Sequence, residues 1–249
     1  MNNSNRILVR AWGDLACFTR PEMKVERVSY SVITPSAARG LLEAIFYRPE
    51  FRWRVHRIAV RKPVRFLAFR RNEVKSKASA RNPQPIIAEE DRTQRNTLAL
   101  RGLDYIIEAS LALTDLASRP RTKKKSEEEP AGENTLNKYY AMAMRRIEKG
   151  QCFVQPCFGC REFPAYFELG DPSMMNIGTS ANPDSDLGLM LYDVFDLDTL
   201  HSGKKSLSEP QVTFFHARLE NGILNVPPWS EVKKQLGGAN DGASFECVR

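Results

Sequence analysis

The order of the predicted elements, strand–helix–strand–strand–helix–strand, places the chain in the α+β class as a ferredoxin-like (RRM-like) βαββαβ domain with an appended C-terminal antiparallel β-sheet. Three observations support this class. Apolar residues at helical spacing predict two helices, extended segments rich in β-branched and aromatic residues flank them, and three further short strands follow. Right-handed crossovers would then place four strands in one sheet with both helices on one face.

The predicted domain begins with a strand and a helix. Residues 6–12 alternate basic and apolar side chains, which is typical of a half-buried strand, and we expect the Gly-Asp pair that follows to end it. A short extended segment over 28–33 leads to a helix with Thr34 as its N-cap and Pro35 in its first turn. Four apolar residues recur at helical spacing on the face that we expect to be buried: Ala38, Leu41, Leu42 and Ile45.

The middle of the chain contains two predicted strands and two predicted loops. Residues 53–69 indicate a strand that bends at its Lys-Pro dipeptide and continues beyond the proline. Residues 103–114 indicate the next strand. We expect a long mobile loop over 78–96, which carries two prolines and many polar residues. We expect disorder over 118–133, where a lysine run meets a glutamate run.

A second helix and the C-terminal strands complete the predicted fold. A helix over 134–149 and an extended segment over 162–169 close the βαββαβ domain, which we assign to residues 1–170. A β extension is assigned to residues 171–236, in which an Asn-Gly pair predicts a hairpin turn. Residues 237–249 are expected to form a frayed tail. The strands predicted within the extension span 187–197, 212–219 and 223–226.

Basic residues are concentrated in the first half of the sequence. The net charge at pH 7 is +7, yet residues 1–125 hold 26 Lys and Arg against 12 Asp and Glu, whereas residues 126–249 hold 11 against 18. Such a surplus attracts polyanions, and arginine suits phosphate contacts and base stacking. We therefore expect a nucleic acid as partner, with the acidic half facing protein partners. The alternative is a solvated basic face that keeps the chain soluble.

Composition and motifs disfavour several functional classes. No apolar run approaches the ~20 residues of a membrane helix, and the first ten residues lack a signal-peptide core. We therefore expect a cytoplasmic location and no membrane partner. Cys152, Cys157 and Cys160 have the spacing of some iron–sulfur proteins, but no fourth ligand is apparent, so we interpret them as small residues of a turn. The sequence predicts neither a metal nor a cofactor.

Metal-free cleavage of RNA is the chemistry that these exclusions leave open, with the substrate's own 2′-hydroxyl as nucleophile. Such a site needs a base near the 2′-oxygen, a cation beside the phosphorane and an acid at the leaving 5′-oxygen. Candidates occur at two helix ends, Phe46-Tyr47-Arg48 and Lys138-Tyr139-Tyr140. Lys138 and Tyr139 are expected off the apolar stripe of their helix, whereas Tyr140 is expected in the core. An ordinary exposed helix face is the alternative for the first two.

Three segments of the chain resemble a known family. They are RAWGDLACFTRPEMKVERVSYSVITPSAARGLLEAIFYRP at 10–49, RRNEV at 70–74 and QPCFGCREFPAYFE at 155–168. On these residues the chain is similar to the CRISPR-associated Cas5 (Cas-five) family, in its type I-C branch (the c/d subtype). The resemblance implies a ferredoxin-like domain with a C-terminal β extension. It also implies metal-free cleavage of precursor CRISPR RNA and retention of the 5′ handle in the Cascade surveillance complex, with the repeated backbone subunit and the large subunit as protein partners.

The catalytic pattern of that family is altered in this chain. The resemblance implies a Tyr or His at position 46, where the chain has Phe46, and a His at position 139, where it has Tyr139. Lys138 matches the lysine whose implied role is to stabilise the transition state. A phenol with a pKa of about 10 is a poor base at pH 7 unless Lys138 lowers that pKa. Tyr47 can substitute only if the helix end unwinds.

Two functions of different class follow from the sequence. In the first, the protein is a metal-independent endoribonuclease that uses Lys138, Tyr139 and Tyr47. In the second, it is a handle-binding structural subunit that does not cut, with target duplex DNA near the protospacer-adjacent motif as a further contact. The first is favoured because the resemblance implies a branch that lacks a separate processing enzyme. The residues expected to contact RNA are Arg39, on the exposed side of the first helix, and Arg70, Arg71, Asn72, Lys75, Arg92, Gln94, Arg95 and Arg101.

Overall fold

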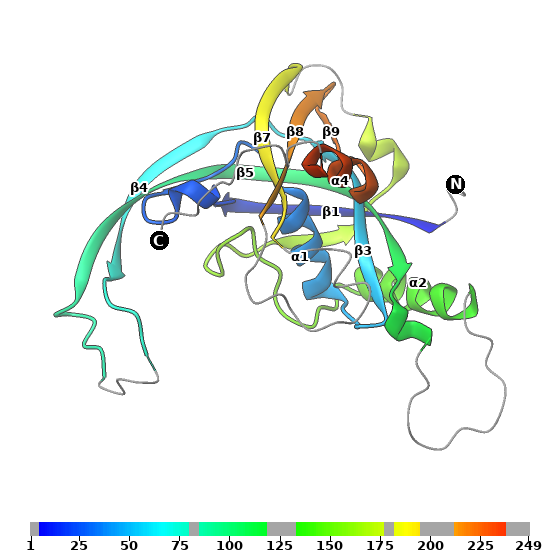
Figure 1. The fold of residues 1–249 in the computed structure, drawn as a ribbon, viewed down its shortest axis with the longest axis horizontal. Coiled ribbons are helices and arrows are strands. Elements are labelled where there is room, and N and C mark those ends of the chain that lie inside the picture. Colours follow the sequence, from blue (N-terminus) through cyan, green and yellow to red (C-terminus); the bar gives the residue numbers. More distant parts are fainter. Residues whose placement is uncertain (1–4, 80–84, 119–132, 177–181, 195–211, 238–249) are drawn as a thin grey trace.

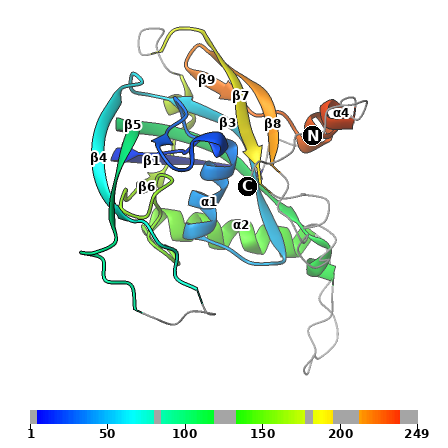
Figure 2. The ribbon, with the colours of Figure 1, turned by 60° about the vertical axis from the view of Figure 1, so that its left-hand side comes forward.

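The structure is a computed structural model of the chain. Its described residues form an α+β fold in which one large, curved sheet carries two helices on one face (Figures 1 and 2). No helix of the described part is long and apolar enough to cross a membrane. The residues that the structure describes are 5–79, 85–118, 133–176, 182–194 and 212–237.

A nine-stranded sheet organises the described residues. Its strand order is β6-β1-β5-β3-β9-β8-β7, with β2 and β4 paired to β5 off this path, and every pairing except that of β2 is antiparallel. The 22-residue β5 pairs with β1, β2, β3 and β4 and so connects most of the sheet. The strands are β1 Arg6–Ala16, β2 Arg27–Val28, β3 Phe51–Val60, β4 Phe66–Val74, β5 Arg92–Leu113, β6 Tyr166–Leu169, β7 Ser185–Asp193, β8 Thr213–Glu220 and β9 Ile223–Asn225.

Helices α1 (Pro35–Ile45) and α2 (Glu133–Glu148) lie on the same side of β1 and β5 (Figure 2). The Thr34 hydroxyl accepts a hydrogen bond from the Ala37 N–H at 3.2 Å, so the predicted N-cap of α1 is confirmed. The four apolar residues predicted to face the core from α1 are all buried. On the opposite face of the sheet, the short helix η4 (Pro172–Met175) packs Met175 against Ala59 and Ile106.

Strands β3 and β4 lie end to end along β5. Val60 of β3 is opposite Tyr105, and Phe66 of β4 is opposite Leu100, so the ladder to β5 is interrupted over the segment between the two strands. Backbone hydrogen bonds still join the two ends of this segment to Asp104 and Arg101 of β5. This confirms the prediction of a strand that bends at its Lys-Pro dipeptide and then continues. Beyond the body of the fold, β4 and the first half of β5 form a projecting two-stranded hairpin (Figure 1).

Several predicted boundaries are wrong because the pairing partners are remote in the chain. Residues 92–96 begin β5 and each pairs with a residue of β4, so they are not the end of a loop over 78–96. Strand β1 continues through Gly13 to Ala16, since β5 pairs with it along this length. A Cβ on Gly13 would lie only 2.8 Å from the Pro164 carbonyl oxygen, which explains glycine inside a strand.

Other expectations are met in part or lie outside the described residues. The extended segment expected over 28–33 has a strand only at Arg27–Val28. The expectation of disorder over 118–133 falls on residues that, except at its two ends, lie outside the described part, and the same holds for the tail over 237–249. The short helix η2 (Pro21–Met23) precedes β2, and η3 (Asp115–Ser118) follows β5.

The C-terminal strands extend the main sheet. Strand β9 pairs with β3 from Arg57 opposite Asn225 to Ala59 opposite Ile223, so the expectation of a separate, appended sheet is wrong. The turn between β8 and β9 holds Asn221 and Gly222 at φ 49° and 74°, as the Asn-Gly pair predicts. Helix α4 (Trp229–Gly237) follows, although the sequence pattern did not indicate it. The division into residues 1–170 and 171–236 stays a prediction.

Candidate active site and nucleic-acid interface

The C-terminus of α1 and the N-terminal half of α2 meet at a cluster of three aromatic rings. The ring centroid of Phe46, the C-cap of α1, lies 5.1 Å from that of Phe51 in β3, and Phe51 lies 5.2 Å from Tyr139 of α2. The indole Nε1 of Trp53 donates a hydrogen bond to the Phe46 carbonyl at 2.8 Å and holds the end of the helix in place. The two helix ends that carry the predicted catalytic residues are therefore brought together, and we call this place the helix junction.

Phe46 belongs to the core. Its side chain is 2% exposed, and the guanidinium carbon of Arg146 in α2 lies 5.3 Å from the centroid of its ring. Because a phenyl ring has no ionisable group, position 46 contributes packing and no proton transfer. The sequence did not single out Arg146, whose place on the buried side of the junction depends on the packing of α2 against α1.

Tyr47 and Lys138 are the predicted catalytic residues that reach the surface of the helix junction. Helix α1 ends at Ile45 and the backbone of Phe46 is extended, so Tyr47 lies outside the helix and meets the condition for replacing position 46. Tyr47 is 56% exposed, and Lys138 is exposed on α2. Tyr139 is half-buried against Phe51, so the expectation that it lies off the packed stripe of α2 is wrong. The junction therefore carries an exposed cation on α2 and an exposed phenol just after α1, each next in sequence to a packed ring, Tyr139 and Phe46.

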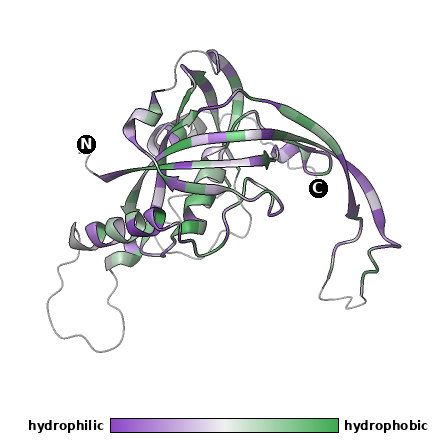
Figure 3. Cartoon of the chain, turned by 180° about the vertical axis from the view of Figure 1, so that it is seen from behind, coloured by the Kyte–Doolittle hydropathy of each residue, from purple (hydrophilic) through white to green (hydrophobic). Residues whose placement is uncertain are grey.

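The predicted RNA contacts of β4 and β5 divide between two faces of the hairpin. Residues directly opposite each other in an antiparallel pair share a face, and Asn72 is opposite Gln94. The Arg70 guanidinium donates to Gln94 Oε1 at 3.4 Å on this same face. Figure 3 shows that the hairpin becomes hydrophilic toward its far end. The exposed side, which we call the hairpin face, carries Arg70, Asn72, Arg92 and Gln94, and Lys75 follows it.

The other side of the hairpin carries Arg71 and Arg95, which are opposite each other in the register. Arg71 donates to Glu73 at 2.8 Å and also to Glu162, and its side chain is only 17% exposed. Two carboxylates therefore compensate its charge before any ligand binds. Arg101, the last predicted contact, is exposed at the base of the hairpin, where its N–H donates to the Arg65 carbonyl at 3.0 Å.

Arg39 does not lie on the exposed side of α1, and that expectation is wrong. Its guanidinium donates to both carboxylate oxygens of Asp193 in β7, at 2.9 and 3.1 Å, and to Glu43 at 2.7 Å. Arg52 of β3 lies 3.7 Å from the same aspartate. The group joins α1, β3 and β7, so its role is structural. The sequence could not reveal it, because Asp193 is 154 positions away from Arg39.

The sheet face opposite the helices is charged but balanced. Arg6 and Arg57 both donate to Glu108, and Arg10 donates to Asp104 at 2.9 and 3.1 Å. Burial raises the pKa of Glu108, but the hydrogen bonds from Arg57 and Arg6 outweigh burial, so the net shift is downward. These ion pairs compensate the arginines of this sheet face, so it carries less uncompensated positive charge than the hairpin face.

Cys17, which follows β1, and Cys160, in the tight turn after Gly159, are both buried and lie side by side. Hydrogen bonding between the two thiols lowers the pKa of Cys17 to about 6 and raises that of Cys160. Gly159 has φ 83°, and a Cβ there would lie 2.0 Å from the Cys17 carbonyl oxygen. Cys160 is therefore a packing residue of this turn. Among the residues that the structure describes, no three His, Cys, Asp or Glu side chains are placed to hold a metal ion.

Comparison with known proteins assigns the family. Residues 6–227 match the family described as CRISPR-associated protein (Cas_Cas5). A protein of Mannheimia succiniciproducens named CRISPR pre-crRNA endoribonuclease Cas5d is 43% identical over 247 residues, which cover 93% of this chain and 100% of that protein. A protein of the same name from Thermus thermophilus is 40% identical over 231 residues, which cover 89% and 91% of the two chains.

Two solved structures share the fold. One, described as a CRISPR-associated protein, has a TM-score of 0.61 at 20% identity and covers 93% of this chain and 96% of its own. The other, the functionally uncharacterized SMU1763c of Streptococcus mutans, has a TM-score of 0.60 at 19% identity and covers 92% and 95%. On the family match and the identity to the two relatives, this chain belongs to the CRISPR-associated Cas5 family, in its Cas5d (c/d) subtype.

Proposed function

We propose that the protein is the CRISPR RNA-binding subunit of a type I-C Cascade surveillance complex that cleaves precursor CRISPR RNA repeats without a metal ion and holds the 5′ handle. The observation that carries this proposal is the helix junction, where the ends of α1 and α2 meet and the exposed residues Tyr47 and Lys138 adjoin the packed rings of Phe46 and Tyr139 in sequence. Both relatives are named pre-crRNA endoribonucleases, which supports the same reaction. The strand order β6-β1-β5-β3, with α1 and α2 on one face, supports a ferredoxin-like core.

The proposed reaction is a transesterification within the RNA. The 2′-oxygen attacks the adjacent phosphorus, the bond from phosphorus to the 5′-oxygen breaks, and the products carry a 2′,3′-cyclic phosphate and a 5′-hydroxyl. The 2′-hydroxyl gives its proton to a base, and the leaving 5′-oxygen takes one from an acid. We assign Lys138 to the negative charge of the phosphorane, and Tyr47 and Tyr139 to the two proton transfers.

Cleavage of the cognate repeat hairpin in the presence of EDTA tests this function. We expect a discrete cut that generates the 5′ handle on the downstream fragment and leaves a 2′,3′-cyclic phosphate on the upstream fragment. Tight binding without a cut would contradict the enzymatic part and leave the alternative, a handle-binding structural subunit. A cut that appears only after Mg²⁺ is added would contradict the metal-free mechanism.

The hairpin face is proposed to contact the RNA backbone. We expect Arg70→Ala/Arg92→Ala to weaken repeat-RNA binding and to reduce the slope of log affinity against log salt by about 0.7 for each phosphate that the variant no longer neutralises, because each neutralised phosphate releases counterions. Titrations by fluorescence anisotropy at several KCl concentrations measure both quantities. Arg71→Ala is the control, and its effect on the slope is compared per charge removed, since Glu73 and Glu162 already compensate the charge of Arg71. An equal reduction in Arg71→Ala would contradict the division into two faces.

The same proposal gives the protein its partners. These are the repeat RNA and its 5′ handle, together with the repeated backbone subunit and the large subunit of Cascade, in the cytoplasm. Target duplex DNA near the protospacer-adjacent motif is a second polyanion that suits the basic hairpin face. Competition separates the two ligands, because handle binding predicts that unlabelled repeat RNA displaces labelled repeat RNA far better than duplex DNA does. Equal displacement by the duplex would favour the DNA contact.

A further inference from the structure

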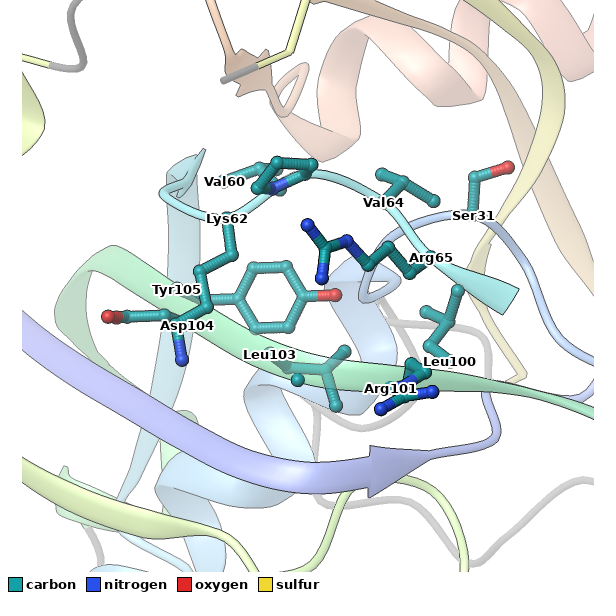
Figure 4. A pocket seen from close by; sticks show the side chains of 12 residues that line it. Ser31, Val60, Lys62, Val64, Arg65, Leu100, Arg101, Leu103, Asp104 and Tyr105 are labelled. Atoms are coloured by element: carbon teal, nitrogen blue, oxygen red, sulfur yellow. The ribbon is translucent and has the colours of Figure 1, made fainter. Parts of the chain in front are cut away.

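The break between β3 and β4 leaves a hollow beside β5. It measures about 340 Å³ and is lined by Lys62, Pro63, Arg65, Arg101 and Gly102. Figure 4 shows Lys62 and Arg65 on the segment that joins β3 to β4, and Arg101 on β5 across from it. Three cationic side chains from two separate segments therefore surround one hollow.

The positive charge of this hollow is not compensated. None of Lys62, Arg65 and Arg101 forms an ion pair with another described residue, and all three are exposed. Asp104 belongs to the adjoining wall, but its carboxylate accepts two hydrogen bonds from Arg10 at 2.9 and 3.1 Å. The nearest acidic group of the wall is therefore already neutralised, and the hollow attracts anions.

The segment between β3 and β4 is held rigidly by Asn182. The side chain of Asn182 is buried and donates to the carbonyls of Val60 and Lys62, at 2.9 and 3.0 Å. Its amide oxygen accepts from the Val64 N–H at 3.2 Å. Because these three hydrogen bonds fix the backbone on both sides of Pro63, the hollow is formed before a ligand arrives. Such preorganisation lowers the entropic cost of binding.

We propose that this hollow is a phosphate-binding pocket that holds one phosphodiester of the bound RNA; the proposal rests on the RNA-binding function proposed above. The guanidinium groups of Arg65 and Arg101 suit paired hydrogen bonds to phosphate oxygens, and the Lys62 ammonium adds a compact positive charge. A phosphate contact fixes the position of the RNA without reading its bases. The pocket is therefore a holding site for the RNA backbone.

The pocket is remote from the helix junction. Phe51 lies in the aromatic cluster of the junction, and Val60 is the last residue of β3 before the segment that carries Lys62, so the two stand at opposite ends of this ten-residue strand. At about 3.3 Å per residue this separation is on the order of 30 Å. The pocket thus acts on RNA affinity and leaves the chemical step at the junction unaffected.

The test compares the pocket variant Lys62→Ala/Arg65→Ala with the control Lys149→Ala/Lys234→Ala, which removes the same charge from the end of α2 and from α4. Repeat-RNA affinity is measured at several KCl concentrations, and cleavage is measured at saturating RNA. For the pocket variant we expect an affinity loss of about ten- to hundredfold and a salt slope lower by about 0.7, the value for one phosphate. Its cleavage rate at saturation should equal that of the wild type, and the control should match the wild type throughout.

Inorganic phosphate distinguishes a phosphate pocket from general attraction between charges. At constant ionic strength, exchanging chloride for phosphate should weaken RNA binding by the wild type more than by the pocket variant, because free phosphate competes for the same cations. If phosphate weakens RNA binding equally in the wild type and in the pocket variant, the proposal of a phosphate-binding pocket is wrong.

Three other outcomes would also overturn the proposal, and they differ in whether the proposed RNA-binding function is retained. If the wild type binds RNA and the pocket variant matches the control, the pocket is wrong and the proposed function stands. If the pocket variant cleaves more slowly at saturating RNA, its role as a holding site is wrong. If the wild type binds no repeat RNA, the proposed function fails and the pocket fails with it.

Discussion

Lys138→Ala is expected to lower the rate of repeat-RNA cleavage by about 100- to 1,000-fold, which is the usual cost of removing one group that stabilises charge in a transition state. Lys138 is an exposed residue of α2, next in sequence to the half-buried Tyr139, and its ammonium is assigned to the phosphorane. RNA affinity should change by severalfold at most, because the proposed backbone contacts lie on the hairpin face. Single-turnover cleavage in EDTA, with affinity measured in parallel, separates the two quantities.

Matched variants make this prediction specific. Lys138→Arg keeps the positive charge and should retain more activity than Lys138→Ala, whereas Lys149→Ala, just beyond the other end of α2, should cut at the wild-type rate. Tyr47→Phe and Tyr139→Phe each remove one hydroxyl and keep the aromatic ring. In Tyr139→Phe the ring can therefore still pack on Phe51. If Lys138→Ala cuts as fast as the wild type, the lysine has no part in the mechanism.

Asp193→Ala is expected to lower the free energy of unfolding by about 3–5 kcal/mol, because it leaves two arginines without their shared partner in a poorly solvated site. The side chain of Asp193 is 5% exposed, that of Arg39 16% and that of Arg52 10%. Burial and the nearby Arg39 lower the pKa of Arg52, so a second positive charge beside Arg39 is unfavourable unless Asp193 balances it. Urea denaturation monitored by circular dichroism measures the change.

Glu168→Ala is the control for this experiment. Glu168 also forms an ion pair, with Arg10 at 2.7 Å, but its side chain is 46% exposed. An exposed pair contributes about 0–1 kcal/mol, so its removal should change the unfolding midpoint little. Asp193→Asn keeps a hydrogen-bond acceptor for the arginines but removes the charge. Its loss of unfolding free energy should lie between those of Asp193→Ala and Glu168→Ala. Equal destabilisation in Asp193→Ala and Glu168→Ala would show that the buried network does not stabilise the fold.

Helices α1 and α2 and the turn of the C-terminal hairpin could be predicted because their signals are local. Thr34 and Pro35 begin α1 within a single turn, and Asn221-Gly222 closes the hairpin between β8 and β9. Strand ends were harder to predict. The length of β1 depends on β5, about ninety positions along the chain, and β9 joins β3 rather than a separate sheet. A pattern within a short window holds no information about such partners.

The candidate site shows the same division between local and remote information. The residue types at the two helix ends, Lys138 and Tyr47 among them, were apparent from the sequence. The burial of Phe46 and the packing of Tyr139 were not, since both depend on Phe51 of β3. Of the three cations of the pocket only Arg101 was predicted to contact RNA, because Lys62 and Arg65 meet it only where β3 and β4 lie end to end along β5.

The sequence by itself determined helices α1 and α2, the Asn-Gly turn, the basic surplus and the side chains able to stabilise or transfer charge during RNA cleavage. Only the tertiary structure decided which of the arginines remain available to a ligand. Asp193 compensates Arg39 and Glu162 compensates Arg71, whereas Arg70 lies on the exposed face of the hairpin. The physical reason is that an ion pair needs contact in space, and these carboxylates lie 154 and 91 positions along the chain from their partners.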